Sequence, residues 1–282
     1  MDDYFQQRNF SIQSKSNPAS LRSQTDQFKV YMSAYDTISL NEMDAVTLMH
    51  RVDTKFLIST EQLSDLLLKA QDYYYVVQIH GDRLIPYKTI YFDTNNTEMY
   101  NMHHNGKLNR VKIRTRSYVN SGISFLEVKN KSNKGRTSKN RILIENRLFE
   151  SMTFKSKESE FVSNITPYIT SGLTPQLQNS FNRITLVDKC MTERVTIDFG
   201  IQFTKVSNGI SEDVGDLVVV EMKQDGVRCS HFRKYLHEMK VLPCSLSKYC
   251  LGMVLVNPEI KNNRFKNKIR KITKISNNHV KL

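Results

Sequence analysis

Charged residues occupy every second position in several segments of this 282-residue sequence. The positions are Arg51, Asp53 and Lys55; Arg110, Lys112, Arg114 and Arg116; Glu127 and Lys129; Lys139 and Arg141; Arg194 and Asp198; and Glu221 and Lys223. Valine, isoleucine, leucine or methionine fills most of the positions between them. Because side chains alternate between the two faces of a β-strand, each set lies on one face of its strand. The pattern predicts strands with one charged and one apolar face.

A charged strand face can simply be the solvated face of an antiparallel sheet, and for any single strand that explanation is the more common one. Six strands together concentrate Arg and Lys, and two of them contain the step Glu-x-Lys, in FLEVK and VVEMK. Closing such a sheet into a barrel turns its polar face into the lining of a tunnel. Closely packed Arg and Lys repel one another unless an anion neutralises them, and Arg presents forked donors that match phosphate oxygens. This lining favours a triphosphate as its occupant.

The acidic residues on the same face need a separate explanation. A hard divalent cation that bridges phosphate and carboxylate oxygens would supply one. Glu221 is the first candidate ligand and Glu127 is the second. For both residues the alternative is a salt bridge to a neighbouring Lys or Arg within the sheet.

Periodicity and turn residues predict the elements that carry these side chains. Strands are expected at 51–58, 73–79, 88–93, 108–119, 123–130, 139–146, 179–189, 193–204 and 216–223. Helices are expected at 42–50, at 59–69 with a capping box of Ser59 and Gln62, near Thr94, within 151–166 and at 228–239. The predicted fold class is therefore α+β, an antiparallel β-barrel tunnel with helices packed on the outside.

The composition limits the domain organisation. With 39% hydrophobic residues the chain can bury one main core, expected over residues 28–257. Residues 1–27 are polar and are expected to be mobile. Residues 258–282 form a basic tail, which from Ile260 onward contains eight Lys or Arg and no Asp or Glu. It is expected to be extended or loosely helical, either as a solubilising tail or as a polyanion contact. The formal net charge of +13 favours a polyanionic partner.

Other classes of site find little support in the sequence. Four cysteines without a C-x-x-C pair indicate the reduced thiols of a cytoplasmic protein. No stretch has the roughly 18 apolar residues of a membrane span, and the amino terminus does not resemble a secretory signal. There is no P-loop, no G-x-G-x-x-G and no G-x-S-x-G motif. His103 and His104 are expected on the surface, without a catalytic role.

The chain also contains an ordered series of longer motifs: RVDTKFLI, YFDTNNTEMYNMHHNGKLNRVKIRTRSY, FLEVKNK with KGRTSKNR, NRITLVD, RVTIDFG, VVVEMK and LSKYCLG. From about Met43 to Val256 this series resembles the VTC domain of polyphosphate polymerases. That family belongs to the triphosphate tunnel metalloenzymes, together with CYTH-type triphosphatases and cyclases. CYTH relatives typically begin with Glu-x-Glu-x-Lys, so Arg51-x-Asp53-x-Lys55 favours the VTC branch.

The resemblance implies roles for particular residues. Nucleotide phosphates would be held by Lys55, Arg114, Arg116, Lys129, Arg183, Arg194 and Lys223, and Glu221 would bind Mn²⁺ or Mg²⁺. Ser247 and Lys248 would add phosphate contacts, and Arg51 and Lys112 of the charged face are counted with them. Lys139 and Arg141 would line the route of a growing polyphosphate, unless they belong to a solvated hairpin.

The implied activity is transfer of the terminal phosphoryl group of ATP onto a growing inorganic polyphosphate chain. Two alternatives remain open: hydrolysis of an inorganic or nucleoside triphosphate in the same fold, and a non-catalytic module that binds polyphosphate or another polyanion. Nucleic acid is not the expected partner. The fungal relatives also carry an SPX sensor and membrane helices that this sequence does not show, so a separate membrane-protein partner is a further expectation.

Overall fold

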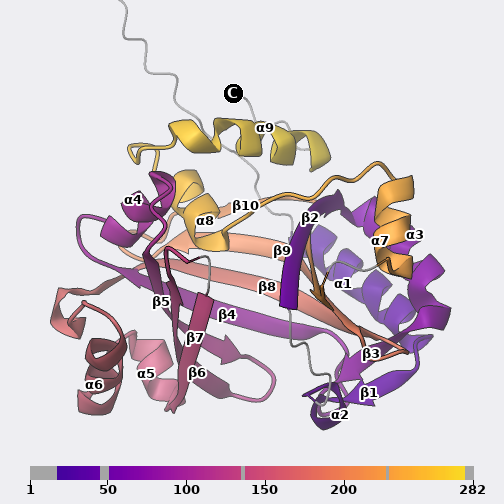
Figure 1. The fold of residues 1–282 in the computed structure, drawn as a ribbon, viewed down its shortest axis with the longest axis horizontal. Coiled ribbons are helices and arrows are strands. Elements are labelled where there is room, and N and C mark those ends of the chain that lie inside the picture. The colour runs from indigo at the N-terminus through magenta and orange to yellow at the C-terminus, as the bar shows by residue number, and fades with distance from the viewer. Residues whose placement is uncertain (1–17, 45–50, 135–136, 227–228, 277–282) are drawn as a thin grey trace, which may run out of the picture.

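The computed structural model describes residues 18–44, 51–134, 137–226 and 229–276. Its centre is one curled sheet whose neighbouring strands follow the antiparallel order β2-β11-β9-β8-β4-β5-β6-β7 (Figure 1). These strands are β2 (Arg51–Ser59), β4 (Ile85–Asp93), β5 (Arg110–Tyr118), β6 (Ile123–Lys131), β7 (Thr137–Ile144), β8 (Thr174–Asp188), β9 (Glu193–Lys205) and β11 (Leu217–Asp225). Three short strands extend the sheet, namely β1 (Thr37–Ser39) beside β3 (Tyr74–Gln78), β3 beside β8, and β10 (Ser211–Asp213) beside β9.

The sheet curls without closing into a barrel. Strands β2 and β7 are its two ends, and no backbone pairing joins them in the described part of the chain. The pairing register shifts between Ser180 and Asn182 of β8, opposite Gly200 of β9, whose φ of 59° is in the left-handed region. Such irregularities bend strands and increase their twist. The α+β class and the antiparallel tunnel architecture are therefore confirmed, whereas the closed barrel is corrected to a strongly bent open sheet.

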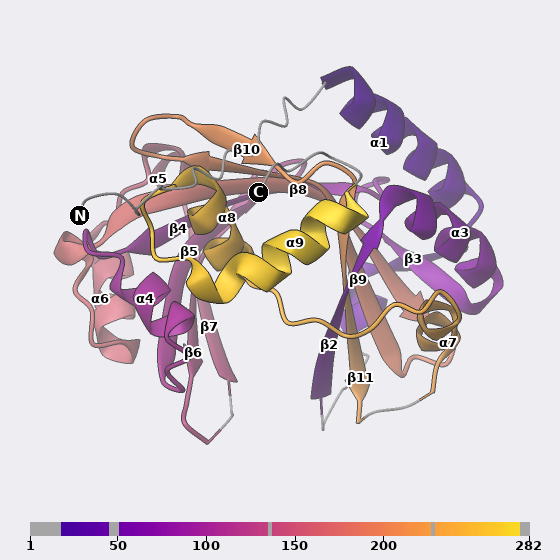
Figure 2. The same cartoon turned by 90° about the horizontal axis from the view of Figure 1, so that it is seen from above.

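Three helices cover the outer face of β2, β11, β9 and β8 (Figure 2): α1 (Pro18–Ser33), α3 (Thr60–Ala70) and α7 (His231–Glu238). Phe28, Leu63 and Phe232 from these helices are fully buried in one apolar cluster with the outward side chains of the strands. The predicted capping box at the start of α3 is confirmed, because Ser59 Oγ accepts from Gln62 N at 3.1 Å and Gln62 Oε1 accepts from Ser59 N at 3.0 Å.

A second outer cluster covers β4, β5 and β6 and is completed by α5 (Asn146–Ser151) and α6 (Ser156–Ile165). Ile113, Leu126 and Val162 are fully buried there. Because both outer clusters take up the apolar side chains of the strands, the alternating charged residues must face the concave inner side. The remaining helical elements are α2 (Leu40–Asp44), α4 (Glu98–His104), η1 (Gln71–Tyr73) and η2 (Thr170–Gly172).

One end of the inner face is apolar and is filled by α8 (Lys248–Val256). Every residue of α8 after Lys248 is buried, in a cluster that includes Leu57, Tyr91 and Phe203 of the strands. After α8 the chain forms η3 (Asn263–Phe265) and α9 (Lys266–Ile275), which pack on the same apolar cluster. Figure 2 shows α9 running from α8 toward β2. The charged part of the inner face therefore begins where α8 begins.

Two predicted boundaries differ from the structure. Residues 18–27, expected to be mobile, form the first part of α1, whose Phe28 and Met32 are fully buried and hold the helix on the sheet; residues 1–17 lie outside the described residues. The basic segment, expected to be an extended or loosely helical tail, forms the helix α9 on the core, because Phe265, Ile269 and Ile272 are buried in the inner apolar cluster. The predicted helix at 42–50 lies outside the described residues from position 45 onward. No helix of the described segments is long and apolar enough to cross a membrane.

The close packing of α8 against β8 and β9 gives a stability prediction. A Cβ at Gly252 would stand 2.4 Å from Cδ1 of Phe203 and 2.5 Å from Cδ2 of Leu177. We expect Gly252→Ala to lower the free energy of unfolding by about 1–3 kcal/mol, since overpacking displaces neighbours. Guanidinium chloride denaturation measures this, with Gly172→Ala as control because its Cβ would meet nothing within 4 Å. A Gly252→Ala protein within about 0.5 kcal/mol of wild type would contradict the packing of α8 against β8 and β9.

Candidate active site

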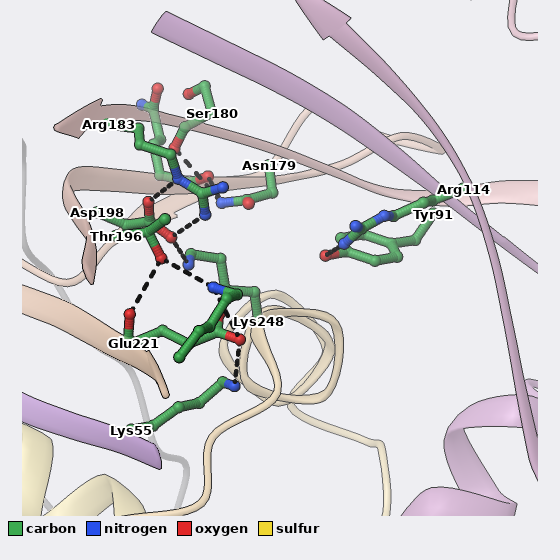
Figure 3. A network of polar contacts seen from close by, with 12 residues as sticks. Lys55, Tyr91, Arg114, Asn179, Ser180, Arg183, Thr196, Asp198, Glu221 and Lys248 are labelled. Atoms are coloured by element: carbon green, nitrogen blue, oxygen red, sulfur yellow. Dashed lines mark hydrogen bonds and ion pairs between the residues drawn. The ribbon is translucent and has the colours of Figure 1, made fainter. Parts of the chain in front are cut away.

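The charged inner face has two walls, and the wall made by β2, β11, β9 and β8 is neutralised by its own carboxylates. The pairing register sets Glu221 opposite Lys55 and sets Lys223 opposite Arg194. Glu221 Oε1 lies 3.2 Å from Lys55 Nζ and 3.3 Å from Lys223 Nζ (Figure 3). Burial alone would raise the pKa of Glu221, but Lys223 and Lys55 more than offset it, so the pKa lies well below its usual value and the group is a carboxylate.

A second carboxylate on this wall, Asp198, joins the sheet to α8. Arg183 donates from Nε to Asp198 Oδ1 at 2.6 Å and from Nη2 to Oδ2 at 2.8 Å, and Lys248 of α8 forms an ion pair with the same Oδ2 (Figure 3). The Asp198 side chain is 4% exposed. Burial would raise its pKa, yet Arg183 and Lys248 bring the pKa below its ordinary value. A bidentate guanidinium–carboxylate pair fixes both side chains in one geometry.

The second wall, formed by β5, β6 and β7, holds one buried carboxylate. Glu127 is 1% exposed, with Arg114 Nη2 at 2.6 Å from its Oε2 and Lys139 in ion contact with Oε1. Burial would raise the pKa of Glu127, but Arg114, Arg116 and Lys139 lower it further than burial raises it. These contacts form the salt bridge within the sheet that was the alternative to metal binding by Glu127. They leave the carboxylate enclosed by cations.

The other cations of the second wall have no ion-pair partner among the described residues. Burial, followed by repulsion from Arg114, lowers the pKa of Lys129 to about 7. Burial lowers the pKa of Lys112 to about 8, and its Nζ donates to Ser247 Oγ at 2.9 Å. Arg116 is 9% exposed, its Nε has no hydrogen-bond partner, and its guanidinium lies 5.4 Å from the centre of the Tyr87 ring. A buried cation without a partner is unfavourable, so this wall is built for an anion that it lacks.

The structure brings most of the predicted site residues to this inner face. Ser247 is the N-cap of α8 and receives the hydrogen bond from Lys112. Arg141 is exposed on the edge strand β7, with its guanidinium 4.7 Å from the centre of the Phe125 ring. Arg51 begins β2 opposite Asp225 in the backbone register. Their assignment to phosphate binding stays a prediction.

Sequence reasoning left some residues of the site without a role. Asp198 was part of the alternating pattern, but only the fold shows that it anchors both Arg183 and Lys248. Tyr87 lies between two guanidinium groups, 4.9 Å from that of Arg183 and 5.4 Å from that of Arg116. No sequence signal marks such a tyrosine, because aromatic residues are common in strands. The surface position expected for His104 is wrong: this side chain is 3% exposed and packs on Phe265.

Few acidic side chains of the inner face are placed to bind a divalent cation. Among the residues that the structure describes, no three His, Cys, Asp or Glu side chains come together as a metal centre. Mg²⁺ and similar ions usually take one or two protein carboxylates and complete their shell with phosphate oxygens and water. Glu221, at 22% exposure and on the inner face, fits that role, whereas Glu127 at 1% exposure is enclosed by Arg114 and Lys139.

A bent antiparallel sheet with a cation-rich inner face and helices on the outside defines a triphosphate-tunnel type of protein. The family model of the VTC domain matches residues 50–257, most of the chain. The chain belongs to the VTC domain family, which supports a polyphosphate-related or triphosphate-handling function.

Solved structures resemble this one at low sequence identity. A proposed adenylate cyclase from Bacillus halodurans is 15% identical, with 71% of this chain and 96% of that chain covered and a TM-score of 0.47. A proposed adenylyl cyclase from Hippeastrum, described as having a dominant triphosphatase activity, is 13% identical, with 75% of this chain and 100% of that chain covered and a TM-score of 0.47. A search of curated proteins finds no match to the sequence.

The unneutralised wall predicts an unusual pH dependence of stability. Burial lowers the pKa of Lys112 from 10.5 to about 8 and that of Lys129 from 10.5 to about 7, so between the lowered and the ordinary values the unfolded chain binds more protons than the folded one. Stability must therefore rise with pH through this window. We expect the Tm of the ligand-free protein at low salt to rise from pH 7 to about pH 9.5, below the range in which tyrosines titrate.

Added tripolyphosphate should raise the Tm most at pH 7, where these lysines are charged. The Lys112→Met protein should show a shallower rise of Tm with pH, whereas Lys88→Met, at an exposed position on the outer face, should behave as wild type. A Tm that stays flat or falls between pH 7 and about pH 9.5 would show that the pKa values of the inner lysines are not lowered in the folded protein.

Proposed function

We propose that this protein is a polyphosphate polymerase, which transfers the terminal phosphoryl group of ATP onto the end of a growing inorganic polyphosphate chain and releases ADP. Membership of the VTC domain family supports the proposal. The observation that carries it is the second wall, where Lys112, Lys129 and Arg116 face inward without ion-pair partners in the described segments. Linear phosphates are the ligands with enough charge to neutralise a wall of this kind.

The chain's own cations would bind and align the reacting phosphates. Lys112, Lys129 and Arg116 supply the positive charge of the second wall, and Lys55, Lys223, Arg183 and Arg194 face them from the first wall. Such alignment lets a terminal phosphate oxygen of the acceptor approach the terminal phosphorus of ATP in line with the bond that breaks. The same cations stabilise the charge that moves onto the leaving ADP.

The state of the inner carboxylates favours transfer to phosphate over transfer to water. Glu221, Asp198 and Glu127 all have a lowered pKa because each contacts two cations, so none is suited to take a proton from water. A phosphate acceptor is already ionised and needs no general base. This supports a polymerase more than a triphosphatase of the same fold.

A divalent cation, Mn²⁺ or Mg²⁺, would be held by Glu221 together with phosphate oxygens of the substrate. When bound, it would neutralise phosphate charge and polarise the transferred group. Lys55 and Lys223, both within ion-pair distance of Glu221, keep that side chain ionised and oriented toward the inner face.

The activity itself is tested by incubating purified protein with ATP and Mn²⁺ or Mg²⁺, with and without a short polyphosphate primer. We expect a ladder of polyphosphate chains on a stained gel and one ADP per phosphate added. Glu221→Gln should abolish both, because the cation loses its protein ligand. Free phosphate without chains would replace the proposal with a triphosphatase, and polyphosphate binding without turnover would replace it with a binding module.

A binding prediction tests the second wall separately. We expect Lys129→Met to raise the Kd for tripolyphosphate by at least about tenfold, since a charge-assisted contact is lost. The free energy of unfolding of the ligand-free protein should stay unchanged or increase, because the substitution removes a buried charge without a partner. Calorimetric titration and denaturation measure the two quantities, with Lys88→Met as the exposed control. A Lys129→Met protein that loses stability and binding together would give Lys129 a structural role instead.

A further inference from the structure

Helix α9 lies on the outside of the protein (Figures 1 and 2) and carries a row of exposed basic side chains. Its inward side is held by Phe265, Ile269 and Ile272, which are buried in the inner apolar cluster. Its outward side carries Lys266, Arg270 and Lys274, all exposed. These three residues are spaced four apart, so they follow one side of the helix at intervals of about 6 Å.

This outward face carries no counter-charge of its own. Residues 258–282 contain one acidic residue, Glu259, and eight Lys or Arg. None of the α9 cations makes an ion pair with any residue in the described ranges. The apolar residues of α9 are already buried in the protein, so the exposed face can attract a partner only by charge. A polyanion is the partner that this surface fits.

Helix α9 is linked to the inner site by the loop that precedes α8, through Lys268 on another side of the helix from the outward row. Lys268 of α9 donates to Ser245 Oγ at 3.2 Å, and two residues later Ser247 Oγ accepts from Lys112 of the second wall at 2.9 Å. One short loop therefore contacts both the inner wall and α9. Burial, followed by the charges of Lys112, Arg110, Lys268 and Lys131, lowers the pKa of His103 to about 3.

We propose that the outward face of α9 binds the distal part of the same polyphosphate chain whose end lies at the inner face, so that affinity increases with chain length beyond the triphosphate. This inference rests on the proposed function. An anionic membrane would also be attracted by charge, but the loop that contacts both Lys268 of α9 and Lys112 of the inner wall places α9 next to the phosphate site, which favours one extended ligand.

The test compares tripolyphosphate with a longer polyphosphate chain as ligands of the wild-type protein and of a triple variant, Lys266→Gln, Arg270→Gln and Lys274→Gln. The variant should lose on the order of tenfold to a hundredfold in affinity for the long chain. The slope of log affinity against log salt should become shallower by about 2. Its affinity for tripolyphosphate should not change, because the inner wall is intact.

A matched triple variant, Lys88→Gln, Lys234→Gln and Lys240→Gln, removes the same charge at exposed positions elsewhere and should keep the long-chain affinity. Equal losses of long-chain affinity in both triple variants would overturn the inference. An α9 variant that no longer binds phosphatidylserine vesicles but keeps its affinity for the long chain would also overturn it. If wild-type protein failed to bind tripolyphosphate, the proposed function would fall, whereas dependence of long-chain binding on α9 would still support this surface.

Discussion

Repulsion among the inward-facing cations of β5 and β6 is the constraint on which the rest of this structure depends. Lys112, Lys129 and Arg116 are held in partly or fully buried positions, and within the described ranges no carboxylate forms an ion pair with them. Such an arrangement is unfavourable by itself, and burial on the outer face has to offset it. The two outer apolar clusters do so, because helices on both flanks take up the side chains that alternate with the cations. The packing of the outside thus maintains an inner face that is complete only with an anion.

Helix α8 fixes where the charged region ends. Its buried side chains fill one end of the concave face, and Gly252 allows the helix to approach β8 and β9 closely. Its first turn is the polar part, where Ser247 contacts Lys112 on one wall and Lys248 contacts Asp198 on the other. The helix that closes the apolar end therefore also sets the distance between the walls.

The alternation of charge was enough to predict the inner face, since it depends only on the geometry of single strands. The pairing of Glu221 with Lys55 and of Asp198 with Arg183 depends on register between strands far apart in sequence, which no local pattern reveals. Helix α8 was missed because an apolar run has no helical periodicity when all its sides are buried. Helix α1 was missed, and α9 was expected only as an extended or loosely helical tail, because a few apolar residues, such as Phe28 and Ile269, hold otherwise polar segments on the core.

Under the proposed function one site has to serve a polyphosphate chain of changing length, and the two walls suit that requirement. Glu221, Asp198 and Glu127 of the inner face each contact two cations, so these three carboxylates stay ionised and have little capacity to take a proton from water. Along β5 the cations Arg110, Lys112, Arg114 and Arg116 repeat at every second residue, at intervals of about 7 Å. A repeating polyanion meets similar contacts each time it advances along a repeating row of cations. A site built this way can hold a longer product much as it held the shorter one, which a site of unique pairwise contacts could not do.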